Sequence, residues 1–134
     1  MHRQSLVVNT QNREEFKDIT AEIRNFIQAT GVEKGFLTVF VPHTTAGVTV
    51  NEGADPAVSR DLLYILGKLV PHFDPKYEHY EGNSDAHAKA SLLGSSLNLL
   101  VENGDLFLGT WQAVFFAEFD GPRQRRVYLA LAGS

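Results

Sequence analysis

Apolar side chains recur along this chain with two periods, one typical of helices and one typical of strands. Residues 19–27 carry them at the i, i+4, i+7 and i+8 spacing of an amphipathic helix, and Gly31 is placed to end that helix. Asp55 and Pro56 form a strong helix start, because aspartate accepts free backbone N–H groups and proline suits the first helical position. Leucines and valines continue that second helical pattern to Pro71.

Short runs rich in β-branched and aromatic residues predict the strands. These runs lie at residues 5–9, 35–41, 46–50, 97–101, 106–108, 113–119 and 127–131. Asn103-Gly104 predicts a hairpin turn, residues 120–122 predict another turn, and a third, shorter helix is expected to begin at a Ser84 cap and end at Gly94. Strands outnumber helices, so we expect an α+β fold: a largely antiparallel sheet or β-sandwich with two to three helices.

Length and composition limit the classes of protein. The 134 residues are expected to form a single domain, 1–134, with no linker or internal repeat. A net charge of −4 argues against nucleic acid as a partner, and the absence of cysteine excludes disulfides and thiolate metal sites. No apolar run approaches the roughly 18 residues of a membrane span. The N-terminus has no signal-peptide core, so a cytoplasmic location without a membrane partner is expected.

Histidines concentrate in the middle of the chain. His43 follows a predicted strand, His79 lies in a glycine-containing loop near Glu81, and His87 lies on the short helix. Each histidine alone is explained by the ordinary intermediate burial of this residue type. Three imidazoles together suit zinc or a similar divalent ion with an open position for water or substrate, although this spacing is weakly specific.

Polar residues on either side of the strand predicted at residues 46–50 are further candidates for a functional site. Asp55 is explained by helix capping. Glu52 has no such local role, and it is interpreted as a general base, a partner that orients a ligating imidazole, or a solvated acid. Thr44 and Thr45 offer hydroxyl donors to an anion, or they are β-branched strand residues.

Three arginines follow the last predicted turn. Strand alternation places Arg123 and Arg125 on one face and Arg126 on the other. A pair of guanidinium groups suits bidentate binding of a phosphate or carboxylate. An edge strand kept soluble by charge, or a salt bridge between subunits, explains the same residues equally well.

Four ordered blocks resemble the YjbQ family, also called UPF0047, over nearly the whole chain. The first contains His43-Thr44-Thr45-Ala46, Asn51-Glu52 and Asp55-Pro56, and the second contains Tyr77-Glu78-His79, Glu81-Gly82-Asn83 and His87. The other two blocks lie at residues 91–112 and 118–125. Four blocks in the family's order are far more specific than any one of them. Around residues 83–86 the spacing departs mildly from the family pattern.

The resemblance implies an α+β sandwich that assembles as a homotrimer. It also implies that His43, His79 and His87 gather around a metal or small anion, with Thr44, Thr45, Asn51 and Asn83 as further binding residues. Members of the family are often labelled secondary thiamine-phosphate synthases, which join hydroxymethylpyrimidine diphosphate to thiazole phosphate and release pyrophosphate. A small phosphorylated substrate is therefore expected.

The same residues are also compatible with two functions other than thiamine phosphate synthesis. Pyrophosphate release needs charge stabilisation, which Arg123, Arg125 and a divalent cation would supply. Mg²⁺ suits phosphate chemistry but prefers oxygen ligands, whereas three imidazoles favour zinc. A zinc-dependent hydrolase with Glu52 as base is one alternative. A binding module without turnover, in which the histidines hold an anion, is the other.

Overall fold

The computed structural model describes residues 1–134 and contains eight strands and three helices. The strands are β1 (His2–Asn9), β2 (Glu15–Asp18), β3 (Gly35–Phe40), β4 (Ala46–Glu52), β5 (Ser96–Glu102), β6 (Asp105–Phe107), β7 (Gln112–Glu118) and β8 (Gln124–Gly133). The helices are α1 (Thr20–Thr30), α2 (Pro56–Leu69) and α3 (Ser84–Leu93).

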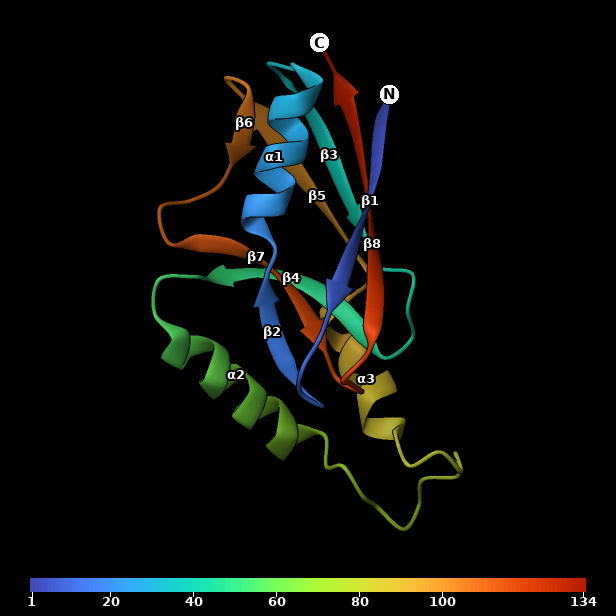
Figure 1. Cartoon of the computed structure of the whole chain (residues 1–134). Helices are drawn as coiled ribbons and strands as arrows, with labels where there is room; N and C mark the ends of the chain where they lie inside the picture. The colour runs from blue at the N-terminus through green and yellow to red at the C-terminus, as the bar shows by residue number, and fades with distance from the viewer.

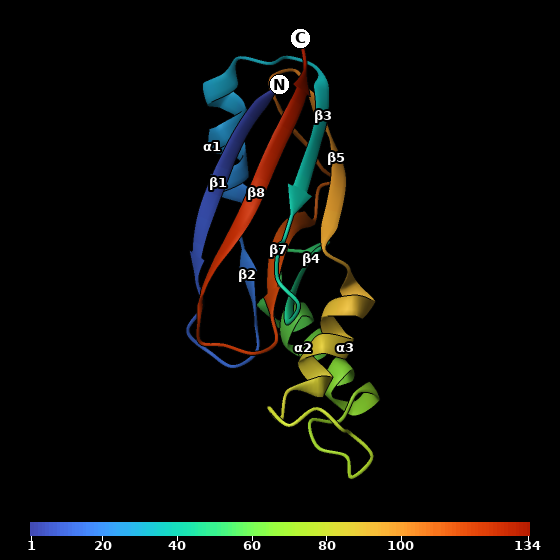
Figure 2. The same cartoon turned by 90° about the vertical axis from the view of Figure 1, so that its right-hand side faces the viewer.

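Two sheets form the body of the protein (Figures 1 and 2). One sheet has five strands in the order β1-β8-β3-β5-β6, and the other has three in the order β2-β7-β4. Every strand pair is antiparallel. The expected α+β class with largely antiparallel strands is therefore confirmed.

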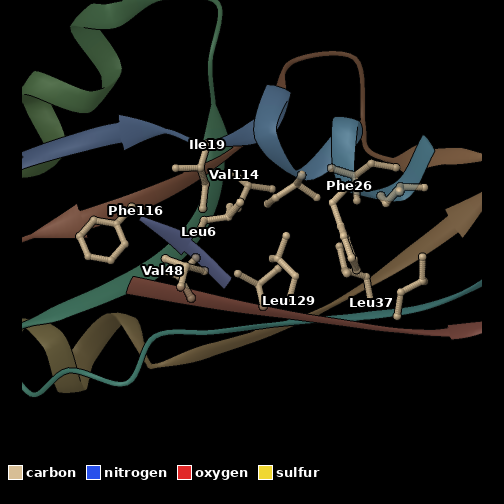
Figure 3. Packing of buried hydrophobic residues seen from close by; sticks show 14 of the residues in the cluster. Leu6, Ile19, Phe26, Leu37, Val48, Val114, Phe116 and Leu129 are labelled. Carbon is tan, nitrogen blue, oxygen red and sulfur yellow. The ribbon is translucent and has the colours of Figure 1, made fainter. Parts of the chain in front are cut away.

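The main hydrophobic core lies between the five-stranded sheet and a layer made of α1 and the three-stranded sheet (Figure 3). Leu37 of β3 and Leu129 of β8 point toward this layer, from which Phe26 of α1 and Val114 and Phe116 of β7 point back. These five side chains are buried, so the two layers are held together by apolar contact.

Local signals in the sequence correctly placed several boundaries. Gly31 ends α1 with a left-handed φ of 73°. The Asp55 carboxylate accepts a hydrogen bond from the backbone N–H of Ala57 at 2.9 Å, as its predicted capping role requires. Asn103 and Gly104 both have positive φ, 52° and 76°, in the turn between β5 and β6.

Two local predictions need correction. Strand β2 was not predicted, because Glu15–Asp18 contains one aromatic residue and three charged ones; the strand forms by pairing with β7. The cap of α3 is Asn83 and not Ser84, which is already helical. The Asn83 side chain does not cap the helix, because it is directed instead to Asp120.

Helix α2 and the loop that follows it lie at one end of the molecule, below the sheets in Figure 1. No residue of α2 is fully buried, although Leu63 and Leu66 pack against the smaller apolar cluster around α3. Tyr64 and Leu69 remain largely exposed. None of the three helices has the length and apolar character needed to span a bilayer.

Candidate functional site

A polar hollow of about 420 Å³ gathers residues from three distant parts of the chain. The loop after β3, the segment that leads into α3, and the turn between β7 and β8 form its walls. No hydrophobic side chain lines it. The lining residues are Pro42, His43, Thr44, Thr45, His79, Glu81, Asn83, His87, Asp120, Arg123 and Arg125.

The His43 ring is fixed by the backbone of β8. Its Nε2 atom accepts a hydrogen bond from the backbone N–H of Arg126 at 3.0 Å. The proton of the neutral ring therefore lies on Nδ1. Burial, followed by the nearby positive charge of Arg125, lowers the pKa of His43 below its ordinary value of 6.5. At neutral pH this imidazole is uncharged and has one N–H to donate.

His79 and His87 lie beside each other on another wall of the hollow. Their ring centroids are 5.4 Å apart and the rings meet edge to face. The His79 Nε2 atom lies 3.9 Å from a carboxylate oxygen of Glu81, which is an ion pair when the ring is protonated. His87 is carried by α3 and His79 by the preceding loop, so the position of α3 determines the distance between the two rings.

Arg125 is held in a buried ion pair with Glu118. Its Nε and Nη2 atoms donate to the two carboxylate oxygens of Glu118, and Nη2 also donates to Thr45 Oγ1 at 2.8 Å. Burial alone would raise the pKa of Glu118, but the hydrogen bonds from Arg125, the Asp120 backbone and Thr10 outweigh it, so the pKa is lowered from 4.5. This pair fixes the turn that forms one wall of the hollow.

Asp120 lies in this same turn and links it to the segment that leads into α3. One of its carboxylate oxygens accepts hydrogen bonds from Asn83 at 2.8 Å and from Arg123 at 3.0 Å. Burial of Asp120 would raise its pKa, but these two donors lower it below 3.8. The Arg123 side chain is 53% exposed, and its Nε also donates to the Asp120 carbonyl at 2.7 Å, so Nη1 is the guanidinium nitrogen without a partner in the chain. Asn83 Oδ1 is buried without a hydrogen-bond partner.

The structure brings most of the predicted site residues together but leaves two apart. His43, His79, His87, Thr44, Thr45, Asn83, Arg123 and Arg125 all line the hollow. Asn51 and Glu52 lie at the far end of β4, roughly 20 and roughly 23 Å along the strand from Thr45. Glu52 lines a separate groove of about 400 Å³ beside the start of α2.

Asp120 and Glu118 are site residues that sequence reasoning did not assign. Glu118 is the single charged residue of β7, in an otherwise apolar run. A lone carboxylate in such a strand requires an internal cation, and this requirement could have pointed to Glu118 and its partner Arg125. Asp120 carried no comparable signal, because acids are common in turns.

In this chain alone the three histidines are not arranged as a ready metal-ligand set, and a metal role for them stays a prediction. No group of three His, Asp or Glu side chains is close enough to share one ion. The lone pair of His43 Nε2 is already used by the Arg126 N–H, and binding a metal through Nδ1 would require that atom to lose its proton. The hollow offers guanidinium, imidazole N–H and hydroxyl donors, beside the carboxylates of Glu81 and Asp120.

These features define an α+β protein with two antiparallel sheets and a polar, histidine-lined hollow between loops. A family model described as UPF0047 protein YjbQ-like matches residues 4–134. The chain therefore belongs to the UPF0047 (YjbQ-like) family.

Relatives of known sequence and structure cover almost the whole chain. UPF0047 protein YugU of Bacillus subtilis is 46% identical over 129 residues, which is 96% of this chain and 98% of the relative. UPF0047 protein MJ1081 of Methanocaldococcus jannaschii is 48% identical over 126 residues, 94% of this chain and 91% of the relative. A crystal structure of an uncharacterized conserved protein of the yjbq/upf0047 family from Clostridium acetobutylicum superimposes with a TM-score of 0.94 at 49% identity, covering 96% of this chain and 99% of that one.

Proposed function

We propose that the polar hollow binds the phosphate group of a small molecule. The observation that supports this is the half-exposed side chain of Arg123 in a hollow with no hydrophobic lining. His43 adds an imidazole N–H, and the hydroxyl of Thr44 lies on the same wall. Arginine and N–H donors recognise phosphate by charge-assisted hydrogen bonds.

The reaction proposed for this site is the coupling of hydroxymethylpyrimidine diphosphate to thiazole phosphate. The thiazole nitrogen would bond to the pyrimidine methylene carbon as pyrophosphate leaves it, and Arg123 would stabilise the negative charge on the pyrophosphate. Arg125 acts indirectly, because its donors are engaged by Glu118 and Thr45. Little proton transfer is needed, which agrees with a site that holds a neutral His43 and no adjacent Glu52.

Replacing Arg123 by glutamine is expected to weaken binding of inorganic phosphate about tenfold, because one charge-assisted contact is lost. The same change is expected to lower the rate of thiamine phosphate formation at least as much. Phosphate affinity is measured by isothermal titration calorimetry, and product formation is followed from the two purified precursors.

Arg126→Gln is the matched control, because this neighbouring arginine is exposed and does not line the hollow. This variant should change neither the phosphate affinity nor the rate of thiamine phosphate formation. Phosphate binding without product, even at high enzyme concentration, would reduce the function to ligand binding. Stoichiometric zinc in protein purified without a nickel column, lost in His79→Ala, would instead favour a metal-dependent hydrolase.

We also propose that the outer face of the five-stranded sheet packs against further copies of the chain in a homotrimer. Phe36, Leu100 and Phe107 lie in one row across β3, β5 and β6, with Ala132 of β8 next to Phe36. Phe36 is 71% exposed and Phe107 is 57% exposed. A continuous apolar row of this kind is typical of a protein interface.

Phe36→Glu is expected to shift the chain from trimer to monomer, because burying an unpaired carboxylate in the interface is unfavourable. Light scattering after size-exclusion chromatography measures the mass. Ala21→Glu, on the exposed side of α1, is the control and should leave the mass unchanged. A monomeric wild-type protein at micromolar concentration would contradict this assembly.

A further inference from the structure

A second hollow of about 440 Å³ adjoins the polar hollow. The two share His43, Thr44 and His87, so these three residues form a common wall. The other residues that line the second hollow come from the start of β4, the end of α3 and the segment before β5. They are Ala46, Ala90, Ser91, Gly94 and Ser95.

The second hollow is built on fixed backbone. Gly94 ends α3 with a positive φ of 97°, and its carbonyl accepts a hydrogen bond from the Val48 N–H at 3.1 Å. The Ser95 carbonyl accepts another from the Val41 N–H at 2.7 Å. A side chain at Gly47 would meet the Gly94 carbonyl at 2.7 Å, so the end of α3 presses directly on β4. The hollow therefore does not depend on the rotamer of a long side chain.

The two hollows differ in chemical character. Four charged residues line the first, namely Glu81, Asp120, Arg123 and Arg125, and none lines the second. Beyond the shared wall, the second hollow offers only methyl groups, serine hydroxyls and backbone. A charged group is well placed in the first hollow and an uncharged group in the second, because burying a charge without a partner is costly.

We infer that the second hollow binds the uncharged, ring-sized body of a phosphate ester whose phosphate occupies the polar hollow. This inference rests on the proposed phosphate site and adds the place where the rest of the ligand binds. His43 and His87 lie where the two parts of the ligand join. The imidazole rings and the hydroxyls of Ser91 and Ser95 suit a flat ring with polar atoms at its edge.

The test compares inorganic phosphate with phenyl phosphate, which carries an uncharged ring. In the wild-type protein, phenyl phosphate is expected to bind about tenfold more tightly than inorganic phosphate, because its ring leaves water. Ser91→Leu fills the second hollow and is expected to abolish that advantage. Ala88→Leu is the matched control, since Ala88 is an exposed residue of the same helix outside both hollows. It should keep the tenfold advantage.

Calorimetry of both ligands with the three proteins distinguishes the outcomes, and thermal unfolding verifies that each variant is folded. Equal affinity for the two ligands in the wild-type protein would overturn the inference while leaving the phosphate site intact. An advantage that survives in Ser91→Leu would overturn it as well. Failure of inorganic phosphate to bind, with phenyl phosphate also unbound, would contradict the proposed function and the inference together.

Discussion

Replacing Glu118 by glutamine is expected to lower the free energy of unfolding by about 3–5 kcal/mol, the usual cost of leaving one member of a buried ion pair without its partner. Glu118 is fully buried and the Arg125 side chain is only 6% exposed, so water cannot solvate the guanidinium charge once the carboxylate is gone. Urea unfolding followed by circular dichroism measures the change. Because the same pair fixes a wall of the polar hollow, phosphate binding should weaken in parallel.

The stability lost in Glu118→Gln is expected to arise from the unpaired charge of Arg125, and two further variants test this explanation. Asp105→Asn removes one member of the Arg24–Asp105 pair, whose side chains are 34% and 48% exposed, and should cost no more than about 1 kcal/mol. The double variant Glu118→Gln with Arg125→Met leaves no buried charge at this pair and should lose less stability than Glu118→Gln alone. A double variant that loses more would contradict the charge explanation.

The pH dependence follows from the lowered pKa of Glu118. The unfolded chain takes up a proton at this carboxyl near pH 4.5, whereas the folded protein does so only at lower pH. The stability that Glu118 contributes is therefore fully present above that pH and is lost as the pH falls toward the folded-state pKa. The difference between the wild-type protein and Glu118→Gln should shrink in the same interval.

The elements that could be predicted from sequence are those with their own local signals. Asp55 and Gly31 satisfy the free backbone groups of their helices wherever those helices pack, so they mark the boundaries reliably. Strand β2 has no such signal. It exists because β7 offers an unpaired edge, and only the tertiary structure shows that edge.

The residues of the candidate site could be predicted only in part. The resemblance to the UPF0047 pattern implied that His43, His79 and His87 gather, and the structure lines one hollow with all three. Glu52 is close to His43 in sequence, but β4 separates them by its full length, since an extended strand advances about 3.3 Å per residue. The number of residues between His43 and Glu52 does not show which way the chain runs between them. Because β4 leads away from the polar hollow, Glu52 lies at the other end of that strand.

A second buried charge network supports the helix that carries His87. Lys89 of α3 is 2% exposed, and its ammonium group donates to Glu14 at 2.6 Å and to Asp85 at 3.3 Å. Asp85 is fully buried and also accepts from Arg13 at 3.1 Å. The network joins α3 to the loop between β1 and β2, so it sets the position of the helix against the sheets.

Lys89→Met is therefore expected to lower the free energy of unfolding by about 3–5 kcal/mol, because it keeps most of the side-chain volume but leaves Asp85 buried with less positive charge nearby. Urea unfolding again gives the value. A weaker affinity for phosphate is also expected, because α3 carries His87 and Asn83 into the polar hollow.

Lys68→Met is the matched control for this change. Lys68 is an exposed residue in the last turn of α2, and its ammonium group lies 5.4 Å from the centroid of the Tyr64 ring. Its loss should cost no more than about 1 kcal/mol, as is typical of an exposed cation. If Lys89→Met lost as little as Lys68→Met, the buried network would not be what positions α3. Unchanged phosphate affinity in a destabilised Lys89→Met protein would instead show that the polar hollow forms independently of this network.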